Sequence, residues 1–282
     1  MVKIKIDLEN REKLRRLHTT THIVNHCARI VLGNHVWQNG SNLKPEFGTL
    51  DITHFNNLTL SEIFEIEKLA NKTVFENKKV KVEELSRDKA EEKYGFSLYQ
   101  GGAIPMKKLR VISVEDSDIE ACGGIHMETT GGIGLIKIIE TSKIQDGVVR
   151  LKYVVNEFAL NAIYNNEVLL KDSCDVFSVD KSSIVRTSEK FFNDWKKQNK
   201  EIENLKKELG ELRIQSIETS SDNEFDVSDM DMGTAMQIYT KVMNSKPKLV
   251  LKASKFVIAP CGHDVAGSKK ELNKGKFSVF II

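Results

Sequence analysis

The sequence predicts an α+β fold for the first part of the chain, followed by a long helix and a small α/β C-terminal domain. Apolar residues recur at helical spacing in some stretches, and other short stretches are typical of strands. Because both kinds alternate within residues 1–170, they favour an α+β domain. Forty per cent of the residues are hydrophobic, which is enough to form a core.

The elements of this first segment follow in chain order. Residues 10–32 carry apolar side chains at helical spacing, with Asn10 as the expected N-cap. A second helical face is expected over residues 61–72. Glycines and Pro105 indicate a loop between residues 94 and 105. Strands are expected over residues 73–82, 108–114, 134–141 and 148–155.

A long helix is expected over residues 185–217. A heptad pattern runs through it, which is typical of a coiled coil, at Phe191, Trp195, Gln198, Ile202, Leu205, Leu209 and Leu212. Two arrangements stay open: a coiled coil, formed between chains or folded back on this chain, and a single amphipathic helix packed on its own domain.

The last part of the chain begins with a polar stretch, residues 218–231, which is expected to be a linker. Beyond it, residues 233–243 predict a helix, and residues 249–260 and 276–282 predict strands. The chain is therefore expected to contain three segments, residues 1–170, 171–217 and 218–282.

Two pairs of metal-binding side chains lie far apart in the sequence. On a helix, positions i and i+4 share a face, so His18 and His22 can bind one metal ion. Cys122 and His126 lie among glycines after an expected strand, and therefore in a loop. One thiolate and three imidazoles are the ligand number and chemistry that suit Zn²⁺. The alternative is hydrogen-bonded histidines and a buried thiol, because spacing alone cannot show that the pairs meet.

The overall charge does not indicate nucleic-acid binding, because 42 basic residues face 40 acidic ones. Contacts to phosphates would have to come from local basic patches, although such runs are more often solvated faces; these patches are residues 3–5, 11–16, 107–110 and 246–255. No run is long enough to span a membrane, and no secretory signal precedes the first helix. The scattered cysteines favour a reducing compartment, and a cytoplasmic protein is expected.

Seven short blocks occur in one order, at residues 18–22, 33–41, 51–55, 94–102, 122–126, 130–134 and 144–148. This series closely resembles the editing domain of alanyl-tRNA synthetase in its archaeal-type form. The freestanding AlaX deacylases and the editing domain of threonyl-tRNA synthetase share the His-x3-His and Cys-x3-His pattern. The resemblance covers roughly residues 10–165 and continues more weakly to the C-terminus. It implies an antiparallel sheet with helices against it, and a metal in a cleft.

The activity that this resemblance implies is hydrolysis of tRNA(Ala) wrongly loaded with serine or glycine. A small pocket cannot strongly reject serine, which exceeds alanine by one hydroxyl, so a second, hydrolytic site is the remedy. The implied zinc ligands are His18, His22, Cys122 and His126. With three protein ligands, zinc has an open position and could polarise the ester or activate water. With all four bound, it would instead orient the terminal adenosine region of the tRNA.

Family position makes Thr21 and Gln38 candidates for sensing or orienting the seryl group. The alternative for Thr21 is a hydroxyl bonded to its own helix. The alternative for Gln38 is a loop residue that fixes the turn into Gly40. His54 is expected to have a structural or pocket-lining role. The chain departs from the family at Ile125, where threonine is common, so one hydroxyl is lost beside the last ligand.

The resemblance also implies partners. In the family, the C-terminal domain helps to dimerise the enzyme and contacts the outer corner of tRNA. The usual dense glycine run is absent here. Cys261 and His263 could form a second metal pair, but two more ligands would be needed nearby. The first metal pair begins eighteen residues from Met1, so the chain is expected to be a fragment, a subunit that binds an aminoacylation half, or a freestanding enzyme. The competing function is a non-catalytic, tRNA-binding and dimerising subunit with a structural zinc.

Overall fold

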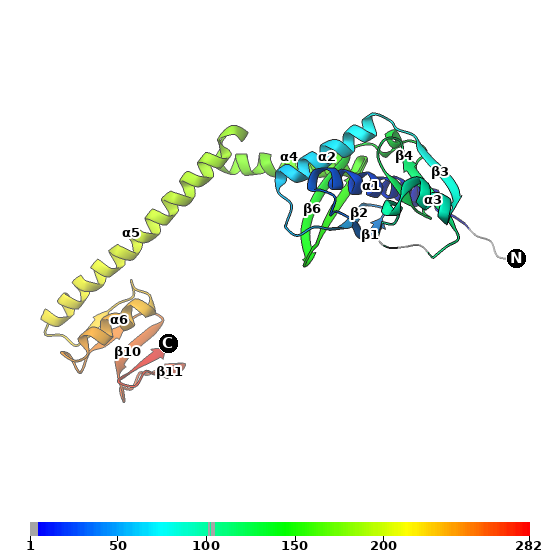
Figure 1. Cartoon of the computed structure of the whole chain (residues 1–282). Coiled ribbons are helices and arrows are strands. Elements are labelled where there is room, and N and C mark those ends of the chain that lie inside the picture. Colours follow the sequence, from blue (N-terminus) through cyan, green and yellow to red (C-terminus); the bar gives the residue numbers. More distant parts are fainter. Residues whose placement is uncertain (1–4, 101, 103–104) are drawn as a thin grey trace. The chain divides into compact units, whose positions relative to one another are not determined.

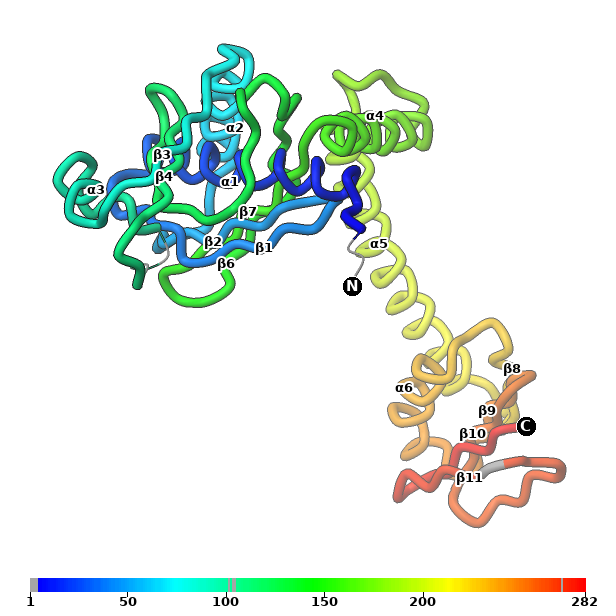
Figure 2. Tube along the Cα trace, turned by 90° about the vertical axis from the view of Figure 1, so that its right-hand side faces the viewer, coloured from blue at the N-terminus to red at the C-terminus, as the bar shows by residue number. Residues whose placement is uncertain are grey.

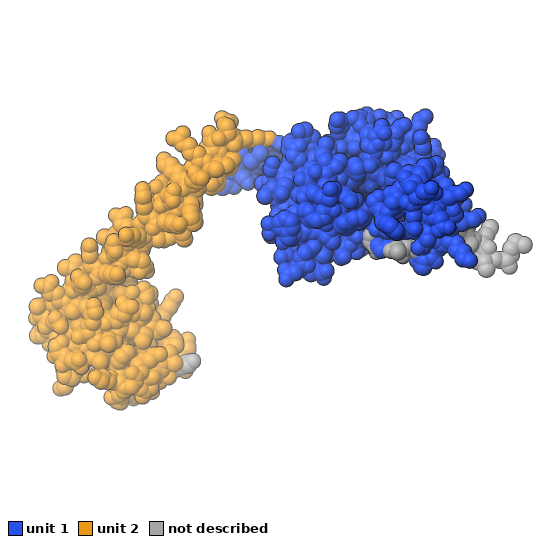
Figure 3. Space-filling view, in the orientation of Figure 1, with its two compact units in different colours: residues 1–176 blue, residues 177–282 orange. Residues whose placement is uncertain are grey.

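The computed structural model describes residues 5–100, 102 and 105–282. It contains two compact units, residues 1–176 and 177–282 (Figure 3). Helices and largely antiparallel sheets occur together, so the α+β class predicted from the sequence is confirmed. The division into segments 1–170, 171–217 and 218–282, expected to be the editing domain, a connecting long helix and a tRNA-binding or dimerising domain, stays a prediction.

The first unit is built on a four-stranded sheet with the order β1-β2-β7-β6, in which all neighbours are antiparallel. Helices α1 (Leu8–Leu32) and α2 (Leu60–Phe75) pack against this sheet and against each other (Figure 1). The apolar side chains between these layers form the main core. The strands are β1 (Gln38–Lys44), β2 (Phe47–Thr53), β6 (Ile136–Gln145) and β7 (Val148–Val155).

Helix α1 carries half of the expected metal ligands. It begins at Leu8 and not after Asn10, because the Asp7 carboxylate accepts a hydrogen bond from the Asn10 backbone N–H at 3.1 Å and is the N-cap. The predicted cap residue was therefore wrong. The helix ends before Gly33, whose φ of 116° favours glycine.

A smaller antiparallel sheet, in the order β3-β4-β5, packs on α3 (Arg87–Tyr94) and the short helix η1 (Phe96–Leu98). The expected strand over residues 73–82 was wrong in its first half. Thr73 and Val74 favour strands by propensity, but both are buried on α2, and this packing outweighs propensity. The strands are β3 (Val80–Ser86), β4 (Lys108–Val114) and β5 (Ile119–Ala121). A short helix, η2 (Thr130–Ile133), precedes β6.

Helix α4 (Glu157–Phe177), which the sequence analysis missed, follows β7. The second unit starts with η3 (Lys181–Ser183) and α5 (Ile184–Thr219). Its five-stranded sheet has the order β11-β12-β10-β9-β8 and packs on α6 (Met232–Val242) (Figure 2). The strands are β8 (Glu224–Asp226), β9 (Val250–Lys252), β10 (Phe256–Pro260), β11 (Lys270–Asn273) and β12 (Phe277–Ile281).

Two expectations for the second unit need correction. The polar stretch expected to be a linker contains β8, which pairs with β9 in parallel. The single strand expected over residues 249–260 is an antiparallel pair, β9 and β10.

The end of α5 packs against α6 through Ile214 and Ile217, whereas its predicted heptad residues are exposed. The coiled coil stays a prediction. Among the helices described, none is both long and apolar enough to cross a membrane.

Candidate metal centre

The structure brings the four predicted ligands together. His18 and His22 come from one face of α1, and Cys122 and His126 from the loop after β5. One ligand atom from each lies within 4.8 Å of the others. The Cys122 Sγ atom lies 3.4 Å from His18 Nε2 and 3.5 Å from His126 Nε2. Tetrahedral Zn²⁺, with bonds of about 2.3 Å to sulfur and 2.0 Å to nitrogen, separates such atoms by about 3.6 Å. The donor set therefore fits zinc in both chemistry and spacing.

Glycine makes the approach of this loop to α1 possible. A Cβ atom at position 124 would lie 1.8 Å from Cε1 of His18, so no larger residue fits without displacing that imidazole. The Gly124 backbone N–H points to Sγ of Cys122 at 3.4 Å. A backbone N–H directed at sulfur stabilises the thiolate form that binds metals.

Two arginines hold the backbone of the same loop. The Arg110 guanidinium donates through Nη1 to the carbonyls of Cys122 and Gly124, at 2.8 and 2.6 Å. Arg15 donates through Nε to the His126 carbonyl at 3.1 Å. The first and last ligands of the loop are thus tied to β4 and α1 respectively. This preserves the ligand geometry through backbone contacts that need no metal.

The protonation of two of the ligands, Cys122 and His126, suits metal binding. Burial alone would raise the pKa of the Cys122 thiol, but hydrogen bonds from His126, His18 and His22 outweigh burial and lower the pKa to about 3. Burial lowers the pKa of His126 to about 4. The site therefore offers a thiolate and a neutral imidazole near neutral pH, which are the forms that coordinate metals.

The second ring nitrogen of His22 faces two buried carboxylates. Its Nδ1 lies 3.1 Å from Oδ2 of Asp118 and 3.3 Å from Oε2 of Glu120. Burial lowers the pKa of His22, but the hydrogen bonds to Asp118 and Cys122 and the nearby carboxylate charges raise it well above its usual value. Sequence reasoning missed both acidic residues. Their positions, two and four residues before Cys122, were the available signal, because alternate residues of a strand share a face.

His126 is held in a comparable way by Thr19. The Thr19 Oγ1 atom lies 3.3 Å from Nδ1 of His126. The same hydroxyl donates to the Arg15 carbonyl at 3.1 Å and accepts from the Met127 backbone N–H at 3.0 Å. Thr19 therefore joins α1 to the end of the ligand loop. It was not among the predicted site residues.

The two residues predicted to recognise the seryl group lie in different settings. Thr21 is 1 % exposed, and its hydroxyl lies 3.0 Å from the Leu17 carbonyl and 2.6 Å from the Tyr153 hydroxyl. This is the helix-bonded alternative left open by the sequence. Gln38 is half-buried at the start of β1, and its backbone N–H donates to Oε1 of Gln100 at 3.3 Å. Its side-chain amide has no hydrogen bond to any other described residue. Both roles stay predictions.

Other predicted residues lie apart from the four ligands. His54 is buried, and its Nδ1 lies 2.9 Å from Nε2 of His35, whose ring it stacks against. Cys261 and His263 belong to neither of the groups of three or more metal-binding side chains found in the described part of the chain. Of the predicted basic patches, residues 3 and 4 lie outside the described residues.

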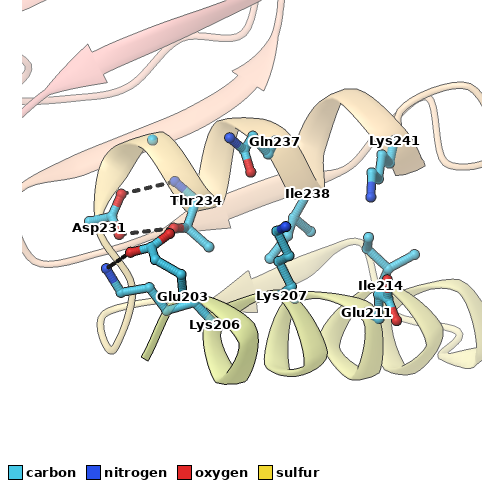
Figure 4. A pocket seen from close by; sticks show the side chains of 12 residues that line it. Glu203, Lys206, Lys207, Glu211, Ile214, Asp231, Thr234, Gln237, Ile238 and Lys241 are labelled. Atoms are coloured by element: carbon cyan, nitrogen blue, oxygen red, sulfur yellow. Dashed lines mark hydrogen bonds and ion pairs between the residues drawn. The ribbon is translucent and has the colours of Figure 1, made fainter. Parts of the chain in front are cut away.

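A cavity of about 470 Å³ lies in the second unit, between α5 and α6 (Figure 4). Lys206, Lys207 and Lys241 line it together with Glu203 and Glu211, so its charges largely balance. Gly210 forms part of the α5 wall, where an added Cβ would meet nothing within 4 Å. None of the predicted site residues lines this cavity.

Comparison with known proteins agrees with the resemblance read from the motifs. The family model described as the threonyl and alanyl tRNA synthetase second additional domain matches residues 109–152, a range that contains Cys122 and His126. The match therefore includes the loop half of the metal centre.

Curated relatives extend the similarity to nearly the whole chain. An alanine–tRNA ligase of Methanococcus vannielii is 38% identical over 282 residues, covering 96% of this chain and 31% of the relative. One of Pyrococcus furiosus is 38% identical and covers 98% of this chain and 30% of the relative. One of Thermococcus kodakarensis is 45% identical over 214 residues, covering 76% of this chain and 23% of the relative. The chain thus spans about a third or less of the length of these relatives.

Proposed function

Because this chain is homologous to the C-terminal half of archaeal-type alanyl-tRNA synthetase, we propose that it is an editing hydrolase. Its substrates would be Ser-tRNA(Ala) and Gly-tRNA(Ala), and the bond cleaved would be the ester between amino acid and tRNA. The observation that carries the proposal is the set of one thiolate and three imidazoles gathered within 4.8 Å. These donors come from α1 and from a loop inside the range matched by the second additional domain.

In this proposal, His18, His22, Cys122 and His126 hold zinc. A zinc ion held there supplies Lewis acidity for an ester carbonyl. Arg110 and Arg15 keep the loop ligands in place through backbone carbonyls, and Thr19 fixes the ring of His126. Three of these side chains as ligands would leave a position for the ester, whereas four would leave none, and the site would then help to orient the tRNA terminus.

Thr21 and Gln38 are the residues proposed to recognise the seryl group. Hydrogen bonding to the extra hydroxyl favours serine over alanine, because alanine would leave the polar partner unpaired. The amide of Gln38 is free to make such a bond with a substrate. Thr21 would have to share a hydroxyl that already contacts Leu17 and Tyr153. Gln38 is therefore the better placed of the two.

The first test uses the purified full chain without any partner. Serine-loaded and alanine-loaded tRNA(Ala) are incubated with it, and loss of each ester is measured with and without a zinc chelator. We expect rapid loss of the seryl ester, retention of the alanyl ester and inhibition by the chelator. Cys122→Ala should abolish hydrolysis while tRNA affinity stays within about tenfold, roughly 1.4 kcal/mol. Cys261→Ala, which removes an exposed thiol of the second unit, serves as the matched control.

The competing proposal is a non-catalytic subunit that binds tRNA and has a structural zinc. Ile125, next to the last ligand, and the low glycine content of the second unit favour it. Loss of neither ester, even after addition of an aminoacylation half, would favour this alternative. Persistence of hydrolysis in Cys122→Ala would refute the metal-dependent mechanism itself.

The proposed partners follow from the same relationship. They are tRNA(Ala), a chain that carries the aminoacylation half, and a second copy of this chain bound through the C-terminal region or paired along the heptad residues of α5. These heptad side chains are exposed, from Phe191 to Leu212. The longer relatives are alanine–tRNA ligases, and we propose that this chain contributes to alanine–tRNA ligation in the cytoplasm.

A further inference from the structure

The acidic pair behind His22 has no role in the proposed function so far. Asp118 and Glu120 are 7 % and 4 % exposed, which is unusual for carboxylates. Asp118 immediately precedes the short strand β5, and Glu120 lies within it, so both side chains can point to the same face. That face is turned towards α1, where His22 lies.

Both carboxyl groups contact the same nitrogen of His22, Nδ1. Asp118 Oδ2 and Glu120 Oε2 lie 3.1 and 3.3 Å from Nδ1 of His22, a nitrogen that a metal bound at Nε2 leaves free. A hydrogen bond from Nδ1 to these carboxyl oxygens requires that Nδ1 carries the proton and donates it. This selects the tautomer whose Nε2 lone pair faces Cys122 and the other ligands.

The partners of the two carboxyl groups also point to His22. Buried carboxyl groups need hydrogen-bond or ion-pair partners. Among the described residues, neither Asp118 nor Glu120 has an ion pair with lysine or arginine, and His22 is the basic side chain that both contact. The geometry therefore directs the acidic pair at the metal-binding ring and not at a neighbouring cation.

The arrangement extends from the metal centre towards β1. Asn25 donates through Nδ2 to Oε1 of Glu120 at 3.2 Å and is 3.2 Å from Oε1 of Gln100. The same Gln100 oxygen accepts from the Gln38 backbone N–H at 3.3 Å. Glu120 is thus fixed at both oxygens, one by His22 and one by Asn25. A side chain held at both ends can fix the orientation of a ring better than a mobile one.

We propose that Asp118 and Glu120 are positioning residues of the metal centre, which fix the His22 ring through Nδ1 and so present Nε2 to zinc. Asn25 and Gln100 extend this support to the strand that carries Gln38. The inference rests on the metal centre of the proposed function, but not on its reaction. It assigns roles to residues that do not themselves touch the metal.

The experiment measures metal binding by the full chain without tRNA. Zinc affinity is determined by competition with a chelator for Asp118→Asn, Glu120→Gln and the double variant. We expect each single variant to lose about 10- to 100-fold in affinity. Replacing zinc by Co²⁺ should give absorption bands that shift in the variants, because the His22 ring is no longer fixed. Glu115→Gln, an exposed carboxylate before the same strand, is the control and should match the wild type.

A second measurement, on the wild-type chain, tests the proposal even if the variants fold poorly. The ¹⁵N chemical shifts of His22 in the zinc-bound chain should show a protonated Nδ1 and a metal-bound Nε2. The opposite assignment would overturn the proposal. So would unchanged zinc affinity and Co²⁺ bands in a folded double variant, or binding of two metal equivalents, which would make the carboxylates ligands. Zinc binding without deacylation would contradict the proposed function alone, because no readout here depends on hydrolysis.

Discussion

Gly124 and His18 lie more than a hundred residues apart in the sequence, yet they are direct neighbours in the structure. A Cβ at position 124 would lie 1.8 Å from Cε1 and 2.3 Å from Nδ1 of the imidazole. The loop that carries Cys122 and His126 can therefore reach α1 only with glycine at this point. The relationship explains a glycine of the Cys-x3-His block through packing and not through turn geometry, since Gly124 is not among the glycines of positive φ.

Gly124→Ala should weaken zinc binding, because the added methyl group must displace either His18 or the loop. We expect a loss of at least tenfold in zinc affinity, about 1.4 kcal/mol. Gly123→Ala is the matched control, because a Cβ there would meet nothing within 4 Å. Chelator competition on both variants provides the comparison. Equal zinc affinities for the two variants would show that the loop relaxes without moving His18.

A second close approach lies in the core of the first unit. A Cβ at position 48 would lie 2.4 Å from the hydroxyl of Tyr153, which is fully buried and bonded to Thr21 and Leu17. Gly48→Ala should therefore lower the free energy of unfolding by about 1–3 kcal/mol, the usual range for overpacking. Gly40→Ala should cost less, because a Cβ at position 40 would lie 3.7 Å from Oδ2 of Asp51, an ordinary contact distance. Urea unfolding of both variants checks this, and a stable Gly48→Ala variant would contradict it.

The helical half of the metal centre could be predicted because helix geometry fixes the spacing of His18 and His22. The loop half could be predicted only as a separate pair. Its contact with α1 depends on Gly124, Arg110 and Arg15, whose long-range contacts have no periodic signal. Asp118 and Glu120 were missed for a similar reason. Acidic residues near a turn are usually solvated, but these two are buried where they contact His22 and Asn25 of α1.

The limits of the fold prediction have the same physical origin. Strands β4 and β7 were predicted with the bounds that the structure shows, since both are rich in β-branched and other apolar residues that alternate with polar ones. The hairpin of β1 and β2 was missed, because asparagine, glycine and serine in β1 weaken its strand signal. The α1 cap was misplaced by three residues because Asp7 and Asn10 are both good N-caps, and only hydrogen-bond geometry distinguishes them.

Gln38→Ala should reduce the preference of the chain for the seryl ester. Its side chain lacks a hydrogen-bond partner among the described residues, so removal should leave the core intact while a bond to the substrate hydroxyl is lost. A lost hydrogen bond of about 1 kcal/mol corresponds to a fall of roughly fivefold in the ratio of seryl to alanyl ester hydrolysis. The measurement is the rate of hydrolysis of the seryl and alanyl esters by the wild type and by Gln38→Ala, with melting temperatures as a check on folding. An unchanged ratio would leave Gln38 with the structural role of fixing the turn into Gly40.

Alkaline pH should destabilise the first unit through Cys27. This thiol is buried on α1, and burial raises its pKa from 9.0 to about 12. At a pH between these two pKa values, the Cys27 thiol is deprotonated in the unfolded chain and protonated in the folded chain, so the unfolded state binds fewer protons. Stability should therefore fall as pH rises from about 9 to about 12, by up to roughly 1.4 kcal/mol per pH unit from this group.

Cys27→Ala removes this contribution, although it lowers stability at neutral pH by leaving a small cavity. The decline in the free energy of unfolding above pH 9 should be shallower in Cys27→Ala than in the wild type. Urea unfolding of the first unit is followed by the fluorescence of Trp37. All chains carry Trp195→Phe, which removes the tryptophan fluorescence of the second unit. Cys261→Ala, with its thiol exposed, should retain the wild-type slope. Parallel slopes for all three chains would show that the Cys27 thiol does not govern the alkaline transition.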